Sequence, residues 1–305
     1  MENYVVFLKD PNVLELIDSI NFSKASKSCR RLSAIKKPYK VQLNFMEPPM
    51  LWFWNGSFGS YRGWKLKDTW IARFFWYLED PFHAMKELYL DAKSLMGVEV
   101  DSVAIYMDDF EEECREIVDW LRPNCQEFSG FYIYGQNQRH EDVQYILDNL
   151  KFKGSLHIFA KTNEQLSLRI PETMDLLSII HGSWITLGYI MSLKISRLAF
   201  ADTNLTNQDI NLIYKSWIEM KSHRNLEWFE INLTDLEGFF EDGLGDIPYQ
   251  IGPIISVPYY TPIEGSIVVT RKDGLMASIS LYQNGIGFAA VMYTSLFRSQ
   301  LQYVD

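Results

Sequence analysis

Short apolar runs recur along the chain from residue 85 onward. In most of them, apolar residues stand at positions i, i+3 and i+5. The runs are Met85/Leu88/Leu90, Val100/Val103/Ile105, Phe128/Phe131/Ile133, Ile195/Leu198/Phe200 and Leu226/Phe229/Ile231, with a looser version at Phe152/Leu156/Ile158 and a strict alternation at Leu166/Leu168/Ile170. Short apolar runs of this kind favour buried strands.

Amphipathic helical patterns separate several of these predicted strands, at residues 111–121, 141–150 and 207–220. The runs that begin at Val100, Phe128 and Phe152 lie 28 and 24 residues apart, and those at Ile195 and Leu226 lie 31 apart. A strand–helix unit of this size is close to the leucine-rich-repeat period of about 20–29 residues. Such units bury their apolar faces only by stacking on one another.

The predicted fold is therefore α/β: a leucine-rich-repeat-like curved stack of strand–helix units with a short helical N-terminal segment and a C-terminal β-hairpin. The hairpin is expected because Asp273-Gly274 separates two β-branched runs at 266–270 and 277–282, and residues 286–293 suggest a third strand. The asparagine of the repeat signature is missing. A different α/β sandwich therefore remains an alternative.

Three regions are predicted along the chain. Residues 1–45 form a helical segment, with its first helix expected to begin near Pro11. A basic run at 24–40 in this segment suits either an acidic partner or a solvated helix face. Residues 46–84 form an aromatic-rich connecting or capping region, turn-rich at first and then helical in spacing from Trp70 to Tyr77. Residues 85–305 form the α/β domain.

Composition narrows the class of protein. The 305 residues carry 39 acidic and 29 basic side chains, a formal net charge of −10, which argues against nucleic-acid binding over the whole surface. Three scattered cysteines are too few for a disulfide framework and favour a reducing compartment. The N-terminus lacks a secretory pattern, so we expect a cytoplasmic or nuclear protein that is not secreted.

One uncharged stretch, residues 176–193, is at the lower limit of a membrane span. Polar residues interrupt it and its apolar period changes midway. A buried strand, turn and helix is therefore the favoured interpretation over a membrane helix.

The sequence contains none of the common catalytic motifs. Its five histidines form no metal-binding pair, and no phosphate loop or nucleophile elbow is present. The acids at 108–113 suit a helix start better than a metal site. We predict no catalytic residue, metal or cofactor, although an enzyme of unrecognised type remains an alternative.

Two passages resemble a known family. Residues 184–195, 205–211, 215–218 and 224–227 follow one another in the order and spacing of the nematode F-box-associated domain of type 2, and residues 267–279 resemble its closing hairpin. The resemblance covers about residues 125–285. Its signature positions are structural: Trp184, Leu205, Thr206, Asp209, Asn211, Trp217, Leu226, Arg271, Asp273 and Gly274.

In that family an N-terminal F-box binds the Skp-type adaptor subunit of a cullin-RING ubiquitin ligase, and the associated domain selects the substrate. Here residues 13–17 and 26–32 resemble the two ends of an F-box, with one or two helical turns fewer between them. The adaptor-binding residues implied by the resemblance are Pro11, Val13, Leu14, Ile17 and Leu32.

The resemblance implies a non-enzymatic substrate-recognition adaptor of an SCF-type ligase, with an unknown protein target. The alternative is a stand-alone protein-binding module with a vestigial F-box. In repeat proteins the exposed strand faces contact partners, which nominates Tyr132, Tyr134, His157 and Lys194. The tryptophans between residues 52 and 64 are an alternative anchor.

Overall fold

The computed structural model describes two compact units. The first comprises residues 1–60 and 65–153, and the second residues 61–64 and 154–305. The described residues are 4–8, 40–54, 70–76, 80–110, 112–164, 167–253, 261–263, 265–284 and 287–298. The three regions predicted from the sequence are a different division and stay a prediction.

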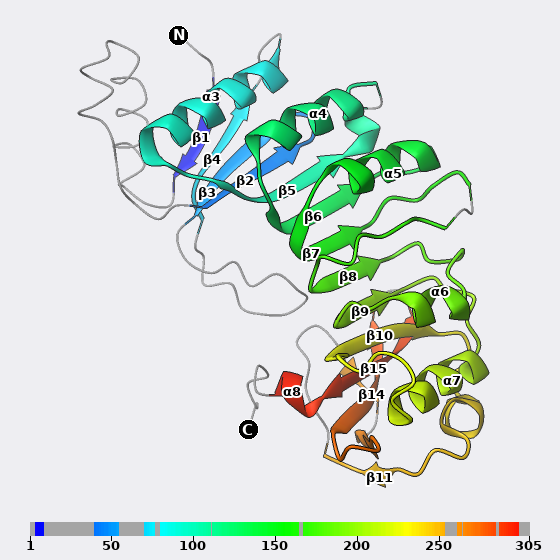
Figure 1. Ribbon diagram of the computed structural model, residues 1–305. Coiled ribbons are helices and arrows are strands. Elements are labelled where there is room, and N and C mark those ends of the chain that lie inside the picture. The colour runs from blue at the N-terminus through cyan, green and yellow to red at the C-terminus, as the bar shows by residue number, and fades with distance from the viewer. Residues whose placement is uncertain are drawn as a thin grey trace. The chain divides into compact units, whose positions relative to one another are not determined.

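The first unit is a mixed sheet with helices along one face (Figure 1). Its strands, in spatial order, are β1 (Tyr4–Leu8), β4 (Trp70–Trp76), β3 (Met50–Trp54), β2 (Lys40–Phe45), β5 (Val100–Tyr106) and β6 (Phe128–Tyr134). The first three pairings are antiparallel, whereas β2–β5 and β5–β6 are parallel. The helices are α3 (Pro81–Met96), α4 (Cys114–Asn124), α5 (His140–Asn149) and the short 3₁₀-helix η1 (Met107–Asp109).

Strand β2 shows how this sheet separates its two faces. Val41, Leu43 and Phe45 are fully buried, and the Phe45 ring lies edge-on to Phe82 of α3 and Trp120 of α4, with centroids 5.4 and 6.4 Å apart. Side chains alternate along a strand, so the intervening positions lie on the face opposite these helices. The sheet of the first unit therefore has an apolar face that the helices cover and a second face to which β2 contributes the polar residues Gln42 and Asn44.

The second unit joins a parallel part to an antiparallel part. Its parallel strands follow chain order, and its antiparallel strands complete the sheet. In spatial order they are β7 (Phe152–Ile158, which begins at the boundary between the units), β8 (Leu176–Ile179), β9 (Arg197–Phe200), β10 (Trp228–Leu233), β15 (Gly287–Thr294), β14 (Met276–Asn284), β13 (Ile267–Thr270) and β11 (Gln250–Ile251), with β12 (Thr261–Pro262) paired to β14. The helices are α6 (Leu187–Ser192), α7 (Asn207–Ile218), the π-helix η2 (Phe239–Leu244) and α8 (Ser295–Arg298).

Polar side chains connect successive strand–helix units of the second unit. Asn232 Oδ1 accepts a 2.8 Å hydrogen bond from the Thr203 amide, and Asn232 Nδ2 donates to the Thr203 carbonyl at 3.1 Å. Asn207 Nδ2 likewise donates to the Asp235 carbonyl at 2.7 Å. These bonds satisfy backbone groups that the sheet leaves unpaired and fix the spacing between neighbouring strand–helix units.

The α/β prediction is confirmed, as are most of its elements. Five of the apolar runs become β5, β6, β7, β9 and β10, and the three helical patterns become α4, α5 and α7. Residues 176–193 contain β8, a turn and α6, and no helix in the described part of the chain is long and apolar enough to cross a membrane. The predicted hairpin is β13–β14, with β15 as its third strand.

Two element assignments made from local spacing are wrong. Residues 85–90 lie in helix α3, whose N-cap Asp80 accepts a 2.9 Å hydrogen bond from the His83 amide and whose fully buried Met85 and Tyr89 lie one turn apart. Conversely, Trp70–Trp76 is strand β4, held between β1 and β3.

Further corrections concern shorter segments. Residues 167–170, the described part of the alternating run, form no strand. The two described pieces of the predicted helical segment 1–45 are strands β1 and β2, and the remainder lies outside the described residues.

Candidate protein-binding site

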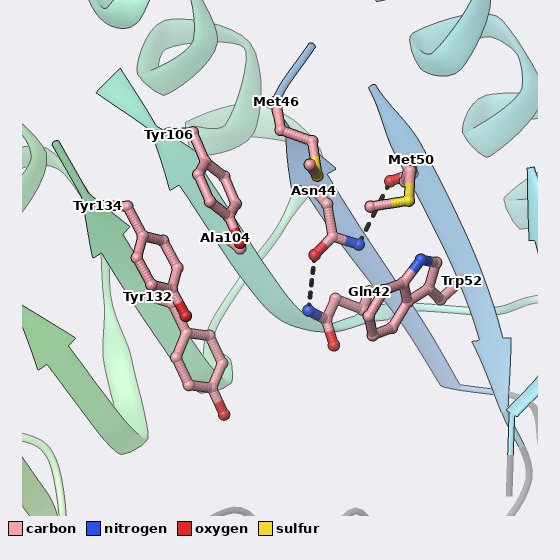
Figure 2. A pocket seen from close by; sticks show the side chains of 9 residues that line it. All are labelled: Gln42, Asn44, Met46, Met50, Trp52, Ala104, Tyr106, Tyr132 and Tyr134. Atoms are coloured by element: carbon pink, nitrogen blue, oxygen red, sulfur yellow. Dashed lines mark hydrogen bonds between the residues drawn. The ribbon is translucent and has the colours of Figure 1, made fainter. Parts of the chain in front are cut away.

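The second face of the first unit's sheet is hollowed into a pocket of about 350 Å³ (Figure 2). It is lined by alternate residues of four neighbouring strands together with one loop residue: Gln42, Asn44, Met46, Met50, Trp52, Ala104, Tyr106, Tyr132 and Tyr134. Register places these side chains in rows across the strands. One row runs Met50–Asn44–Ala104–Tyr132, and Trp52 pairs with Gln42 in the next.

Small residues in these rows create the hollow. Ala104 stands between Asn44 and Tyr132, and the adjacent row ends in Gly130. A Cβ on Gly130 would lie 3.3 Å from Tyr132 Cε2, so the absence of a side chain lets the Tyr132 ring lie close to the sheet. Larger side chains at these positions would fill the space that the aromatic rings enclose.

Two tyrosines form one side of the pocket. Tyr106 and Tyr134 stack with centroids 4.4 Å apart and ring planes 12° from parallel. Burial raises the pKa of both phenols above their ordinary value, so both stay protonated at neutral pH. Their hydroxyl groups are therefore neutral donors and acceptors.

The floor of the pocket is polar and buried. Gln42 Nε2 donates to Asn44 Oδ1 at 2.7 Å, and Asn44 Nδ2 donates to the Met50 carbonyl at 3.4 Å. Gln42 Oε1 has no hydrogen-bond partner, although the side chain is only 6% exposed. An unsatisfied buried acceptor costs about 1–3 kcal/mol.

Exposed carboxylates follow the strand ends at one edge of the pocket. Glu47 comes directly after the lining residue Met46, and its amide donates to Asp109 Oδ2 at 2.9 Å. Asp108 accepts hydrogen bonds from the Gln136 amide at 2.8 and 3.0 Å. These acids thus bind loop amides instead of capping α4, whose N-cap residue Glu113 makes no side-chain cap bond. The described residues contain no cluster able to hold a metal ion.

The described thiols are packed in the first unit's core. Cys114 and Cys125 are free and buried, and burial raises the pKa of each thiol to about 12. A thiol with such a pKa is a poor nucleophile at neutral pH.

The structure brings together only part of the predicted partner surface. Tyr132 and Tyr134 line the pocket, and Trp52, from the predicted tryptophan anchor, lies across it. Lys194 is exposed in the second unit, 3.4 Å from the Glu172 carboxylate. The prediction that His157 is exposed is wrong. Its side chain is 3% exposed because both faces of β7 are buried at this point.

The predicted family-signature residues hold helix α7 in the second unit. Thr206 is its N-cap, and Thr206 and Asp209 form a reciprocal capping box. Asn211 Nδ2 donates to the Gly243 and Leu244 carbonyls at 3.3 and 3.1 Å, which ties α7 to η2. Three other signature residues also have structural roles. Leu205 and Leu226 are buried, and the Trp184 ring lies edge-on to the Tyr189 ring, with the centroids 4.9 Å apart.

The remaining signature residues tie the C-terminal hairpin to α7. Arg271 Nε and Nη2 donate to the two carboxylate oxygens of Asp273 at 2.9 and 2.8 Å, and Nη1 donates to the Arg224 carbonyl at 2.7 Å. The guanidinium carbon lies 5.2 Å from the centroid of the fully buried Trp217 ring. Gly274 has φ +89°, which a glycine adopts at no steric cost in this turn.

His223 extends the network around α7. Its Nε2 lies 3.0 Å from the Ile190 carbonyl and therefore donates to it, which leaves Nδ1 to accept from Ser222 Oγ at 2.9 Å. Burial lowers the pKa of this imidazole below its ordinary value.

We expect the second unit to lose stability on acidification because of His223. A base whose folded pKa is depressed stabilises the fold fully above its unfolded pKa near 6.5, and this contribution falls as pH falls below that value. His223→Gln should weaken the loss between pH 7.5 and 5.0, measured by thermal melting. His83→Gln, at an exposed position of helix α3, should behave as wild type, and equal pH dependence in both variants would contradict this role.

Four of the residues that line the pocket are not among the site residues predicted from the sequence: Gln42, Asn44, Met50 and Tyr106. Apolar and polar residues alternate from Val41 to Phe45, which is the signal of a strand with one polar face. The predicted adaptor-binding residues Pro11, Val13, Leu14, Ile17 and Leu32 lie outside the described residues.

A known protein and a family model are similar to parts of this chain. Over 107 residues the chain is 29% identical to the E3 ubiquitin-protein ligase hecw-1 of Caenorhabditis elegans, a match that covers 30% of this chain and 8% of that protein. The chain thus spans less than a tenth of this relative. No solved structure matches. A family model described as F-box associated matches residues 165–231, which include α6, α7 and the capping box. These residues are therefore similar to the F-box associated family, which confirms the resemblance stated from the sequence.

Proposed function

We propose that this chain is a non-enzymatic substrate-recognition adaptor of a cullin-RING ubiquitin ligase. The observation that carries the proposal is the F-box associated match at residues 165–231. The match to part of a protein named as a ubiquitin ligase supports the same link. In this function the N-terminal residues bind a Skp-type adaptor subunit, and the α/β domain binds the target protein.

The sheet order supports the leucine-rich-repeat-like part of the proposal. Strands β7, β8, β9 and β10 are parallel neighbours in chain order, and α6 and α7 each connect two of them. Side-chain amides join successive turns, as Asn232 does with Thr203. A stack of this kind presents a broad surface to a protein partner.

Binding to the ligase is tested with the full-length chain and purified Skp-type adaptor, alone and with cullin. We expect the wild type to co-elute with the adaptor and Leu14→Glu/Ile17→Glu to lose at least about tenfold in affinity, because charges enter the proposed apolar contact. Point substitutions are preferable to deletion of residues 1–45, because β2 is an interior strand of the sheet. Leu212→Glu, on the exposed face of α7, is the matched control.

A folded wild-type chain that fails to bind the adaptor would overturn the ligase link. Target binding that persists in that case would favour the alternative, a stand-alone protein-binding module with a vestigial F-box. The shortened spacing between residues 17 and 26 is the observation that favours this alternative.

A further inference from the structure

The pocket on the first unit's sheet has aromatic sides and contains a buried hydrogen-bond acceptor that has no donor. Gln42 Oε1 is the acceptor, and it lies on the floor between Trp52 and the tyrosines (Figure 2). A ligand group that brings N–H donors to this floor would remove the cost of leaving the acceptor unsatisfied.

The spacing of the sides suits a flat group. Trp52 is on β3 and Tyr132 on β6, three strand spacings apart, which at about 4.8 Å each is about 14 Å between the backbones. Rings that project from both sides leave room for a narrow side chain between them. Planar cations stack favourably on such ring faces.

Charge near the pocket favours a cation. Glu47, Asp108 and Asp109 are exposed and adjoin the strand ends that carry Met46 and Tyr106. The nine lining side chains include no Lys or Arg, and the whole chain carries a formal charge of −10. A positively charged group is therefore attracted to this edge of the sheet.

We propose that this pocket binds the guanidinium group of an arginine side chain presented by a peptide of the target protein. Arginine supplies a planar cation that stacks on Trp52 and Tyr132 and several N–H donors for Gln42 Oε1 and the phenol oxygens. A lysine ammonium has donors but no flat face. The inference depends on the proposed function only for the origin of the peptide, because the pocket lies wholly within the first unit.

The test measures binding of the blocked tripeptide acetyl-Gly-Arg-Gly-amide to the full-length chain by saturation-transfer NMR. Two matched peptides replace arginine by citrulline, which keeps the shape without the charge, or by lysine, which keeps the charge without the plane. We expect the arginine peptide to bind at least about tenfold more tightly than either. Equal binding of either matched peptide, or no binding of the arginine peptide, would overturn the proposal.

Variants locate the binding in the pocket. Ala104→Leu fills the hollow from the floor, and Gln42→Met removes the acceptor while keeping the length of the side chain. Both should reduce arginine binding at least about fivefold in a chain that circular dichroism shows to be folded. Tyr145→Phe, on α5 at the opposite face, is the control and should bind as wild type. If all three variants bind as wild type, the site lies elsewhere and the proposal fails.

This experiment also separates the two proposals. A wild-type chain that binds the Skp-type adaptor but not the arginine peptide overturns the pocket assignment alone. Peptide binding in a chain that does not bind the adaptor overturns the ligase link alone.

Discussion

Replacement of Trp217 by alanine should lower the free energy of unfolding by about 3–5 kcal/mol. The ring is fully buried on α7, and its removal leaves a cavity and uncovers the Arg271 guanidinium, which lies 5.2 Å from the ring centroid. A loss of this size is a large fraction of the stability of a typical domain. The expected result is a second unit that is largely unfolded at moderate urea concentrations.

Leu212 provides the matched control on the same helix. Its side chain is 50% exposed, so Leu212→Ala should change stability by less than about 0.5 kcal/mol. Urea unfolding followed by circular dichroism measures both variants, and hydrogen exchange of the amides of residues 207–218 assigns the effect to α7. Equal losses in the two variants would contradict a core role for Trp217.

The sequence predicts an element correctly where the element depends only on residues close together in the chain. Thr206 and Asp209 form a capping box whose two members lie three residues apart, and both are among the structural signature positions that the sequence indicates. The Asp273-Gly274 turn was predicted for the same reason, since a single glycine provides the positive φ of a tight hairpin. Both features depend on neighbours within four residues.

Where tertiary neighbours decide, local spacing was misleading. Trp70–Trp76 has a helical spacing of aromatic residues, but β1 and β3 pair with it on both sides, and a strand results. Residues 85–90 share the i, i+3, i+5 pattern of the true strands. The pattern is ambiguous between strand and helix over six residues, and the Asp80-Pro81 start signal of α3 was the information that could have resolved it.

The pocket could be predicted only in part. Tyr132 and Tyr134 were identified because they alternate with buried residues on one strand, which is a local property. Their neighbours Asn44 and Gln42 come from a strand about 90 residues earlier, and parallel pairing through β5 brings them together. No local pattern encodes that pairing. His157 shows the converse limit, because alternation does not reveal that both faces of β7 are buried.

The contact between the C-terminal hairpin and α7 should depend strongly on Arg271. This side chain is 8% exposed and makes three charge-assisted hydrogen bonds, two to Asp273 and one to the Arg224 carbonyl. Arg271→Ala should lower the free energy of unfolding by about 1.5–3 kcal/mol at pH 7. Arg271→Lys keeps the charge but loses the two-pronged geometry, so it should recover only part of the loss.

The stabilisation from the Arg271–Asp273 ion pair within the hairpin should disappear at low pH. Hydrogen bonds from Arg271 lower the pKa of the Asp273 carboxyl to about 2. A depressed folded pKa means that the stabilisation is fully present above the unfolded value near 3.9 and is lost as pH falls through about 2. The difference in stability between wild type and Asp273→Asn should therefore be constant from pH 7 to 5 and shrink between pH 4 and 2.

Carboxyl ¹³C NMR of aspartate-labelled protein measures this titration directly. In Arg271→Ala the pKa of Asp273 should return toward its ordinary value near 3.9, because the group is otherwise solvated. Lys272→Ala, on the neighbouring exposed position, keeps the Arg271 bonds and should leave that pKa near 2. An Asp273 pKa that is the same in wild type and Arg271→Ala would show that the guanidinium does not stabilise the Asp273 carboxylate. The stability lost in Arg271→Ala would then come only from the contacts of Arg271 with the Trp217 ring and the Arg224 carbonyl.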